Sequence, residues 1–417
     1  MPRIFVALLA MTLLVAAAPL SPEQDHQRLL DLLKIKSLRP AVANTDEAKA
    51  NPNPDLPDPL KMKDGKPVDT KDKWWQLRRD EIAEDFDVEV YGGLPGTAPL
   101  PVWSVTDSAN EMVGRVPAVT RHVVGKSVRG AGEVDIRLTV TLPAKAKGPV
   151  PVILELALGD AKSSAPSTWR QQVLAKGWGA AVLDVTSVQP DSAEGLTGGI
   201  IGLTYGKPRE LGEWGALRAW GWGASRAMDF FEGDPKIQSD RVGIMGHGRA
   251  GKAALVAMAY DPRFVVAFIS SSGAGGAAPL RRHYGEGIED LASTSEYYLF
   301  GGAFLKYAGP KTPNDLWLDS NLLIAMCAPR PVFIGAGGKA DARSDPRGMF
   351  MAEVAAGPVY RLLGAKDLGT TKMPPIGKAV TSGALAFRQH AGGSTAEPNW
   401  PVFIAYAQRT LDAPRKH

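Results

Sequence analysis

The sequence has little cysteine, little histidine and no large excess of charge. Cys327 is the single cysteine among 417 residues, so no disulfide can form within the chain, and its apolar neighbours predict a buried, inert thiol. Lys and Arg number 48 against 44 Asp and Glu, a net charge of +4. This balance gives no case for a nucleic-acid partner or an anionic membrane surface. The six histidines form no H-x-x-x-H or clustered His/Cys pattern, so we expect no metal and no cofactor.

Long apolar runs are also scarce, and the one that stands out is at the N-terminus. Arg3 precedes an apolar core at residues 4–15, and small residues follow at 16–18. This order is typical of a secretory signal peptide over residues 1–18, and the run is too short for a spanning helix. An uncleaved N-terminal anchor is the alternative. We expect a periplasmic or secreted protein that does not bind a membrane after cleavage.

The rest of the chain divides into an arm and one domain. Residues 19–110 contain a Pro-rich, Asn-rich stretch whose prolines forbid a long helix or a central strand. This stretch is expected to wrap the surface as an ordered arm or to hang as a linker. Residues 111–412 alternate between strand-like and helix-like runs. The alternation predicts an α/β domain, a three-layer sandwich with a mainly parallel sheet.

Individual elements follow from periodicity and from turn residues. A period-two run predicts an antiparallel strand at 134–144, and apolar runs predict buried strands at 150–158, 179–187, 241–245, 264–272, 330–337 and 384–390. Helices are predicted at 74–92, 210–234, 249–260, 319–328, 349–364 and 401–411. The tryptophans of the 210–234 helix are assigned to core packing rather than to carbohydrate stacking.

The stretch "GIMGHGRAGK" allows two interpretations. Gly246, Gly248 and Gly251 spell G-x-G-x-x-G between a strand and a helix, as in a dinucleotide-binding loop. That fingerprint also needs an acidic residue at the end of the next strand, but here the strand ends in serines. The other interpretation is the nucleophile elbow of a hydrolase, in which small residues flank the catalytic residue. Gly248 then occupies the vertex and has no side chain that could attack an ester.

Motifs along most of the chain support the second interpretation. The elbow resembles the G-[CH]-S-R-x-G-K motif of the glucuronoyl esterases, carbohydrate esterase family 15. The segments "WGALRAWGWGASRAMDFF", "SSSGAGGAAPLRRHYGE", "LLIAMCAPRPVFIGAG" and "FRQHAGGSTAEPNWPVF" resemble the same family in the same order. The resemblance implies an α/β-hydrolase fold and activity on glucuronate esters that join xylan to lignin alcohols, or on methyl esters of glucuronate.

The resemblance also places the catalytic residues. Gly248 stands at the nucleophile position, and Ser394 stands at the histidine position, where relatives read G-G-H-T. Asp341 matches the triad acid after a late strand. In some relatives the acid lies elsewhere, at the position of Ser271.

Further positions match the family's oxyanion and sugar contacts. Arg249 corresponds to the arginine that helps hold the oxyanion, Lys252 to a lysine that contacts sugar hydroxyls, and Glu296 to a sugar-binding glutamate. Arg343 replaces a sugar-stacking tryptophan. Either Glu286 or Glu289 matches another polar contact.

A triad needs a nucleophile, a base and an acid, and the chain keeps only the acid. The sequence therefore predicts a member with impaired catalysis that acts on, or binds, glucuronate-bearing carbohydrate or its esters. A non-catalytic carbohydrate-binding or interaction protein on the same fold is the alternative. A third hypothesis is a hydrolase in which Asp341, helped by His390, activates water, although His390 is expected to be structural. His247 is expected to pack away from the vertex. The oligomeric state is left open.

Overall fold

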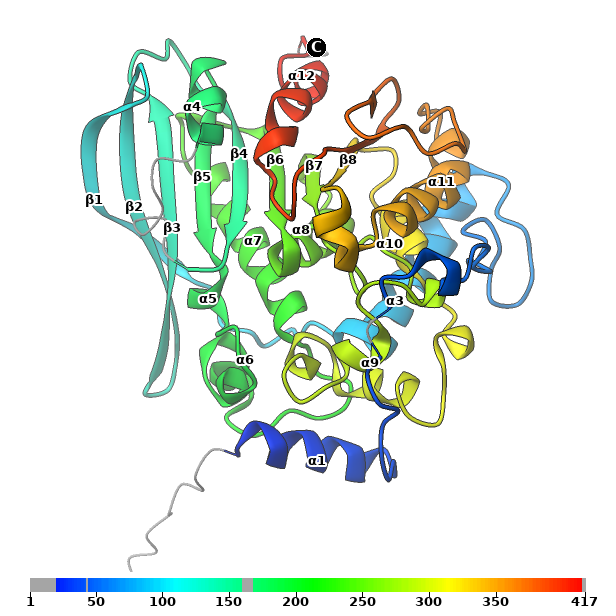
Figure 1. Cartoon of the computed structure of the whole chain (residues 1–417). Coiled ribbons are helices and arrows are strands. Elements are labelled where there is room, and N and C mark those ends of the chain that lie inside the picture. The colour runs from blue at the N-terminus through cyan, green and yellow to red at the C-terminus, as the bar shows by residue number, and fades with distance from the viewer. Residues whose placement is uncertain (1–19, 43, 160–167, 415–417) are drawn as a thin grey trace, which may run out of the picture.

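A ten-stranded sheet forms the centre of the computed structural model, which describes residues 20–42, 44–159 and 168–414 (Figure 1). The strands follow the order β1-β2-β3-β5-β4-β6-β7-β8-β10-β9. Their bounds are β1 Val102–Val113, β2 Val116–Arg129, β3 Gly132–Pro143, β4 Val150–Ala157, β5 Gly179–Asp184, β6 Ile237–His247, β7 Phe264–Ser270, β8 Val332–Ala336, β9 Ala379–Val380 and β10 Leu385–Gln389.

The sheet is parallel in its middle and antiparallel at its edges. β5, β4, β6, β7, β8 and β10 pair in parallel, each with its neighbour in that order. β1, β2, β3 and β5 pair antiparallel at one edge, and β9 pairs antiparallel with β10 at the other. The antiparallel strand predicted at 134–144 is β3. The mainly parallel sheet of the predicted fold class is confirmed.

Helices cover both faces of this sheet, as Figure 1 shows. α4 and α12 pack on one face, against β5, β6 and β7, while α5, α7 and α8 pack on the other. The helical bounds are α1 Pro22–Leu32, α2 Lys71–Lys73, α3 Arg79–Phe86, α4 Thr168–Ala175, α5 Val185–Val188, α6 Gly199–Tyr205, α7 Ala216–Glu232, α8 Gly248–Tyr260, α9 Ile288–Leu291, α10 Ser320–Met326, α11 Pro346–Leu362 and α12 Trp400–Leu411.

The continuous apolar strands follow from burial on both faces. Successive side chains of a strand point to opposite faces. In β4, Val152 and Leu154 belong to the core on the α7/α8 side, whereas Ile153 belongs to the core under α4 and α12. A strand covered on both sides therefore carries apolar residues at most of its positions. Trp214, Trp220 and Trp222 are buried in the core, so their assignment to packing is confirmed.

The N-terminal arm is ordered over its described residues and crosses the surface of the domain. The backbone N–H of Asn51 donates to the carbonyl oxygen of Arg282 at 2.8 Å, and the Asn321 amide donates to the carbonyl of Pro57 at 2.8 Å. These bonds decide between the two alternatives that the sequence left open, an ordered arm and a loose linker. The helix predicted at 74–92 is present as a continuous series of turns from α2 to Tyr91.

Several elements were not predicted from the sequence, among them α1, the β1–β2 hairpin, α4 and α6. The segment proposed as a signal peptide, residues 1–18, lies outside the described residues. Within the described ranges, none of the helices combines the length and the apolar character needed to cross a membrane. Cys327 is fully buried, and burial raises the pKa of its thiol to about 12, which agrees with the predicted inert thiol.

Candidate functional site

The elbow joins two elements at the centre of the sheet. β6 ends at His247 and α8 begins at Gly248, whose φ of +58° lies in the left-handed region. Glycine adopts this conformation without the strain that a side chain brings. An ideal Cβ on Gly248 would meet no heavy atom within 4 Å. The elbow therefore has open space at its vertex and no side chain to fill it.

Ser394, which stands where the family's histidine is expected, faces His247. Its hydroxyl oxygen lies 3.4 Å from His247 Nε2, and His247 Nδ1 lies 3.1 Å from the hydroxyl of the buried Ser270. The ring is only partly buried. Burial lowers the pKa of His247, while the charge of Asp341 partly opposes this shift. The packing predicted for His247 thus comes with two polar contacts that the sequence did not suggest.

Asp341 lies in the kinked 3-10 segment Lys339–Ser344, which follows β8. Its carboxylate is buried, and Oδ2 accepts hydrogen bonds from the Ser271 hydroxyl at 2.6 Å and from the Gly337 N–H at 2.8 Å. The two alternative acid positions are therefore neighbours in space, and a serine occupies one of them. Both hydrogen bonds to Oδ2 come from neutral donors rather than from an imidazole.

His390 directly follows β10 and is buried at the base of the loop that carries Ser394. Its Nδ1 accepts a hydrogen bond from the Gly392 N–H at 3.0 Å, so Nε2 carries the proton and donates to the carbonyl oxygen of Thr395 at 3.0 Å. Both ring nitrogens are thus engaged with the loop backbone. His390 therefore stabilises the loop backbone, in agreement with the structural role that the sequence favoured.

Arg249 is the first residue after the vertex, and both terminal nitrogens of its guanidinium are paired. Nη1 lies 2.9 Å from Asp191 Oδ2, and Nη2 lies 2.5 Å from Glu296 Oε1. The Tyr298 hydroxyl donates to the other oxygen of Asp191 at 2.6 Å. About a third of the Arg249 side chain, 36%, stays exposed. The guanidinium is therefore fixed in position while one side remains open to a ligand.

Lys252 lies one turn further along α8 and is almost fully buried. Nζ donates to the carbonyl oxygen of Ala274 at 2.7 Å and forms an ion pair with Glu286. Of the two glutamates that the resemblance left open, Glu286 is thus the one beside Lys252. Glu289 instead pairs with Arg39 at 2.8 Å.

Arg343 shares its kinked 3-10 segment with Asp341 and is exposed. No hydrogen bond or ion pair of its guanidinium is found among the residues that the structure describes. These residues also contain no group of three or more His, Cys, Asp or Glu side chains that could hold a metal ion.

Known proteins are similar to this chain in sequence and in fold. The family described as "Glucuronyl esterase, fungi" matches residues 126–364. Carbohydrate esterase MZ0003, from an unknown prokaryotic organism, is 32% identical over 411 residues, which cover 89% of this chain and 93% of that protein. A CE15 glucuronoyl esterase from Teredinibacter turnerae is 39% identical, with a TM-score of 0.88 over 93% of this chain and 99% of that chain.

A further glucuronoyl esterase, from Solibacter usitatus, is 34% identical, with a TM-score of 0.78 over 87% of this chain and 99% of that chain. This chain belongs to the glucuronoyl esterase family. The α/β-hydrolase fold expected from the resemblance is confirmed by these structures, and the dinucleotide-binding interpretation of the elbow is wrong.

In this family member the site residues gather at one edge of the sheet. His247, Ser270 and Gln389 are the last residues of β6, β7 and β10, and the segments after them carry Gly248, Ser271 and Ser394. The carboxyl ends of parallel strands meet at one edge, where α/β proteins place their ligands. Asp341 and Asp191 lie in the segments after β8 and β5, in agreement with this rule.

Sequence reasoning missed Asp191 and Tyr298, which together orient Arg249. Asp191 follows a predicted buried strand, and this position after a strand was the feature of the sequence that could have assigned it to the site. Tyr298 lies two residues after Glu296, but the pattern gave no reason to bring it to Asp191. The partners of Arg249 come from segments 47 to 58 residues away, and only the fold defines them.

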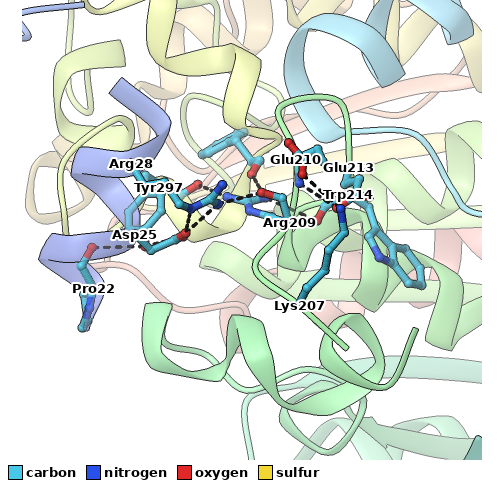
Figure 2. Close-up of polar contacts among 10 residues, drawn as sticks. Pro22, Asp25, Arg28, Lys207, Arg209, Glu210, Glu213, Trp214 and Tyr297 are labelled. Carbon is cyan, nitrogen blue, oxygen red and sulfur yellow. Dashed lines mark hydrogen bonds and ion pairs between the residues drawn. The ribbon is translucent and has the colours of Figure 1, made fainter. Parts of the chain in front are cut away.

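The segment that carries Glu296 and Tyr298 is anchored by α1 through Tyr297, which lies between them (Figure 2). Asp25 of α1 accepts a hydrogen bond from the Tyr297 hydroxyl at 3.0 Å and pairs with Arg28 at 2.7 Å. The buried Arg209 donates to the carbonyl oxygens of Tyr297 and Phe300. The N-terminal helix therefore contributes to the position of residues that hold Arg249.

Proposed function

We propose that this family member binds glucuronate-bearing carbohydrate or glucuronate esters, and that it lacks the turnover that an elbow serine and a histidine at position 394 perform in an active esterase. The observation that carries the proposal is Gly248, which leaves the elbow vertex without an oxygen nucleophile. Ser394 adds to it, because a hydroxyl cannot serve as the base that the histidine position requires. An oxyanion site that acts alone keeps about 10³-fold acceleration over water, far below the rate of an efficient esterase.

Recognition of the sugar is favoured over a purely structural role by the groups around the vertex. Arg249 is partly exposed and oriented by two carboxylates, and Arg343 extends into solvent rather than filling the site. Lys252, Glu296 and Arg343 are the further residues that we assign to the ligand, with Glu286 in preference to Glu289.

The ligand class comes from the relatives. A relative from Hypocrea jecorina is named 4-O-methyl-glucuronoyl methylesterase. An esterase from Sporotrichum thermophile, in a variant with alanine in place of a serine, has been solved with methyl 4-O-methyl-β-D-glucopyranuronate. We choose methyl glucuronate as the probe and propose that this chain, exported by its N-terminal segment, meets such esters in plant cell-wall material.

A restoration experiment tests the lost turnover. Gly248→Ser, Ser394→His and the double variant are assayed for hydrolysis of methyl glucuronate. Because triad residues act as a unit, we expect a gain only in the double variant, of about 100-fold or more over the unmodified chain. Ester hydrolysis by the unmodified chain at the rate of the double variant would contradict the proposal.

Binding is tested separately, by calorimetry of the unmodified chain with methyl glucuronate and with aldouronic acids. We expect saturable binding. Absence of heat at millimolar ligand would remove the recognition part of the proposal and leave an interaction protein on an esterase fold. Arg249→Met serves as the matched variant, which should lose binding while the fold is retained.

A further inference from the structure

Ser394, which occupies the family's histidine position, forms a pair with His247, the residue before the elbow vertex. The Ser394 hydroxyl and His247 Nε2 lie within hydrogen-bond distance, at 3.4 Å. Ser394 is exposed, so a ligand can reach its hydroxyl, whereas the ring of His247 is partly buried behind it. A hydroxyl next to an imidazole nitrogen is the arrangement that activates a serine nucleophile.

The other ring nitrogen of His247 contacts the Ser270 hydroxyl, and one of the two tautomers leaves Nε2 able to act as a base. In the tautomer that carries the proton on Nδ1, this N–H donates to the Ser270 hydroxyl at 3.1 Å, and the lone pair of Nε2 is free to accept from Ser394. Ser270 is fully buried and holds the ring in place. Burial also lowers the pKa of His247, which keeps the ring neutral and able to take a proton at pH 7.

Other serines near the vertex are engaged elsewhere. The Ser271 hydroxyl donates to Asp341 at 2.6 Å. The Ser272 hydroxyl is buried and accepts a hydrogen bond from the Ala277 N–H at 3.0 Å. Ser394 therefore combines exposure with a histidine contact, which neither of these two residues does.

We propose that Ser394 is an acyl-accepting nucleophile and that His247 is its general base. Ser394 Oγ bonds to the ester carbonyl carbon as its proton moves to His247 Nε2. The bond from that carbon to the alcohol oxygen then breaks, and the departing alkoxide takes the proton from Nε2. Water then bonds to the acyl carbon and gives a proton to His247 Nε2, the bond from that carbon to Ser394 Oγ breaks, and Oγ takes the proton from Nε2 as the uronic acid leaves. For its ligand class this inference rests on the proposed function, but the nucleophile itself is tested without that ligand.

The test uses a fluorophosphonate, which transfers its phosphonyl group to an activated serine hydroxyl and releases fluoride with the hydroxyl proton. Intact-mass spectrometry measures the rate, and peptide mapping locates the label. We expect one label per chain at Ser394, loss of that label in Ser394→Ala, and labelling about 100-fold slower in His247→Gln. Ser382→Ala, which removes an exposed serine on the turn before β10, is the matched control and should label like the unmodified chain.

Equal labelling of Ser394→Ala, or a label mapped to another residue, overturns the inference. Ser394→Ala decides the matter alone even if His247→Gln is unstable, because Ser394 is exposed and its side chain contributes little to the core. The outcomes also separate this inference from the proposed function. Binding of methyl glucuronate without a label at Ser394 is consistent with the proposed function and contradicts the nucleophile. A label at Ser394 without binding of methyl glucuronate supports Ser394 as the nucleophile and contradicts the proposed ligand class.

The labelling rate also has a predicted pH dependence. The base must be neutral, so the rate should rise with pH through the lowered pKa of His247 and then level off. The titratable groups whose charges act on the ring are Asp341, from the segment after β8, and His390, directly after β10. A rate that does not change between pH 4 and pH 8 would contradict the role of His247 as the base.

Discussion

Arg249 and Glu296 form an ion pair in which Nη2 lies 2.5 Å from Oε1, on the residue next to the vacated vertex. Asp191 holds the second arm of the same guanidinium, and Tyr298 holds Asp191. A ligand that binds Arg249 does not have to order this side chain, because the two carboxylates have already done so. Preorganisation of this kind lowers the entropic cost of binding.

Asp191→Asn tests this preorganisation. The change removes the charge on one anchor of Arg249 while it keeps the size of the side chain. We expect the affinity for methyl glucuronate in calorimetry to fall about tenfold, since a charged hydrogen bond at a partly exposed arginine is lost. Tyr298→Phe leaves Asp191 charged and should have a smaller effect. Unchanged affinity in Asp191→Asn would mean that Arg249 does not contact the ligand.

The shape of the elbow can be tested with two glycines that differ in their surroundings. Gly248→Ala places a side chain at φ +58° in open space, so we expect a loss of about 1 kcal/mol in the free energy of unfolding from backbone strain alone. Gly246→Ala brings a Cβ to 2.2 Å from the Ala250 carbonyl oxygen. Because this Cβ overlaps with backbone atoms, we expect the free energy of unfolding to fall by about 3 kcal/mol.

Urea unfolding of the two variants provides the measurement. Equal losses would indicate that the turn has relaxed from the geometry of an active elbow. A small loss for Gly248→Ala and a large one for Gly246→Ala would mean that the turn still accommodates a serine, which the restoration experiment requires.

The buried part of the fold could be predicted from the sequence, and the exposed part could not. β4 and β5 are almost continuous apolar runs because both faces of the sheet are covered. β1 has one paired edge and exposed side chains over most of its length, so neither an apolar run nor an alternation marks it. α1 did carry a signal that was overlooked. Ser21 and Gln24 form a capping box at its start, and this pattern is visible in the sequence.

The candidate site also combines residues that the sequence could predict with a contact that it could not. Gly248, Ser394 and Asp341 were found because a linear motif surrounds each of them. The contact between Ser394 and His247 spans 147 residues and depends on how the loop after β10 crosses the end of β6. No spacing rule contains that information, since the two residues meet only when parallel strands align their carboxyl ends.

The anchoring of α1 gives a prediction about stability. Arg209 is fully buried and donates to the backbone carbonyls of Trp214, Tyr297 and Phe300. Arg209→Met would leave these carbonyls without a charged donor, and we expect a loss of about 3 kcal/mol in the free energy of unfolding. Arg28→Met, at a more exposed member of the same network in Figure 2, should cost much less. A loss in Arg209→Met no larger than in Arg28→Met would contradict this account.

Glu353 predicts a pH dependence of stability. It is fully buried in α11, and its Oε1 accepts one hydrogen bond, from the Ala386 N–H at 2.9 Å. Oε2 has no hydrogen-bond partner in the described part of the chain. Burial therefore raises the pKa of Glu353 well above its ordinary value of 4.5. The folded chain keeps the proton at a pH where the unfolded chain has released it.

The direction of the pH dependence of stability follows from this difference in pKa between the folded and the unfolded chain. Above pH 4.5 the unfolded chain binds fewer protons than the folded chain, so the contribution of Glu353 to stability falls by about 1.4 kcal/mol per pH unit until the folded carboxyl also ionises. Glu353→Gln keeps the shape of the side chain but cannot ionise, so this decline should disappear and the variant should exceed the unmodified chain in stability at pH 7. Urea unfolding at pH 4.5 and pH 7 measures the effect, with the exposed Glu194→Gln as the control. A Glu353→Gln variant less stable than the unmodified chain at pH 7 would mean that the ionised carboxylate has a partner that compensates its charge.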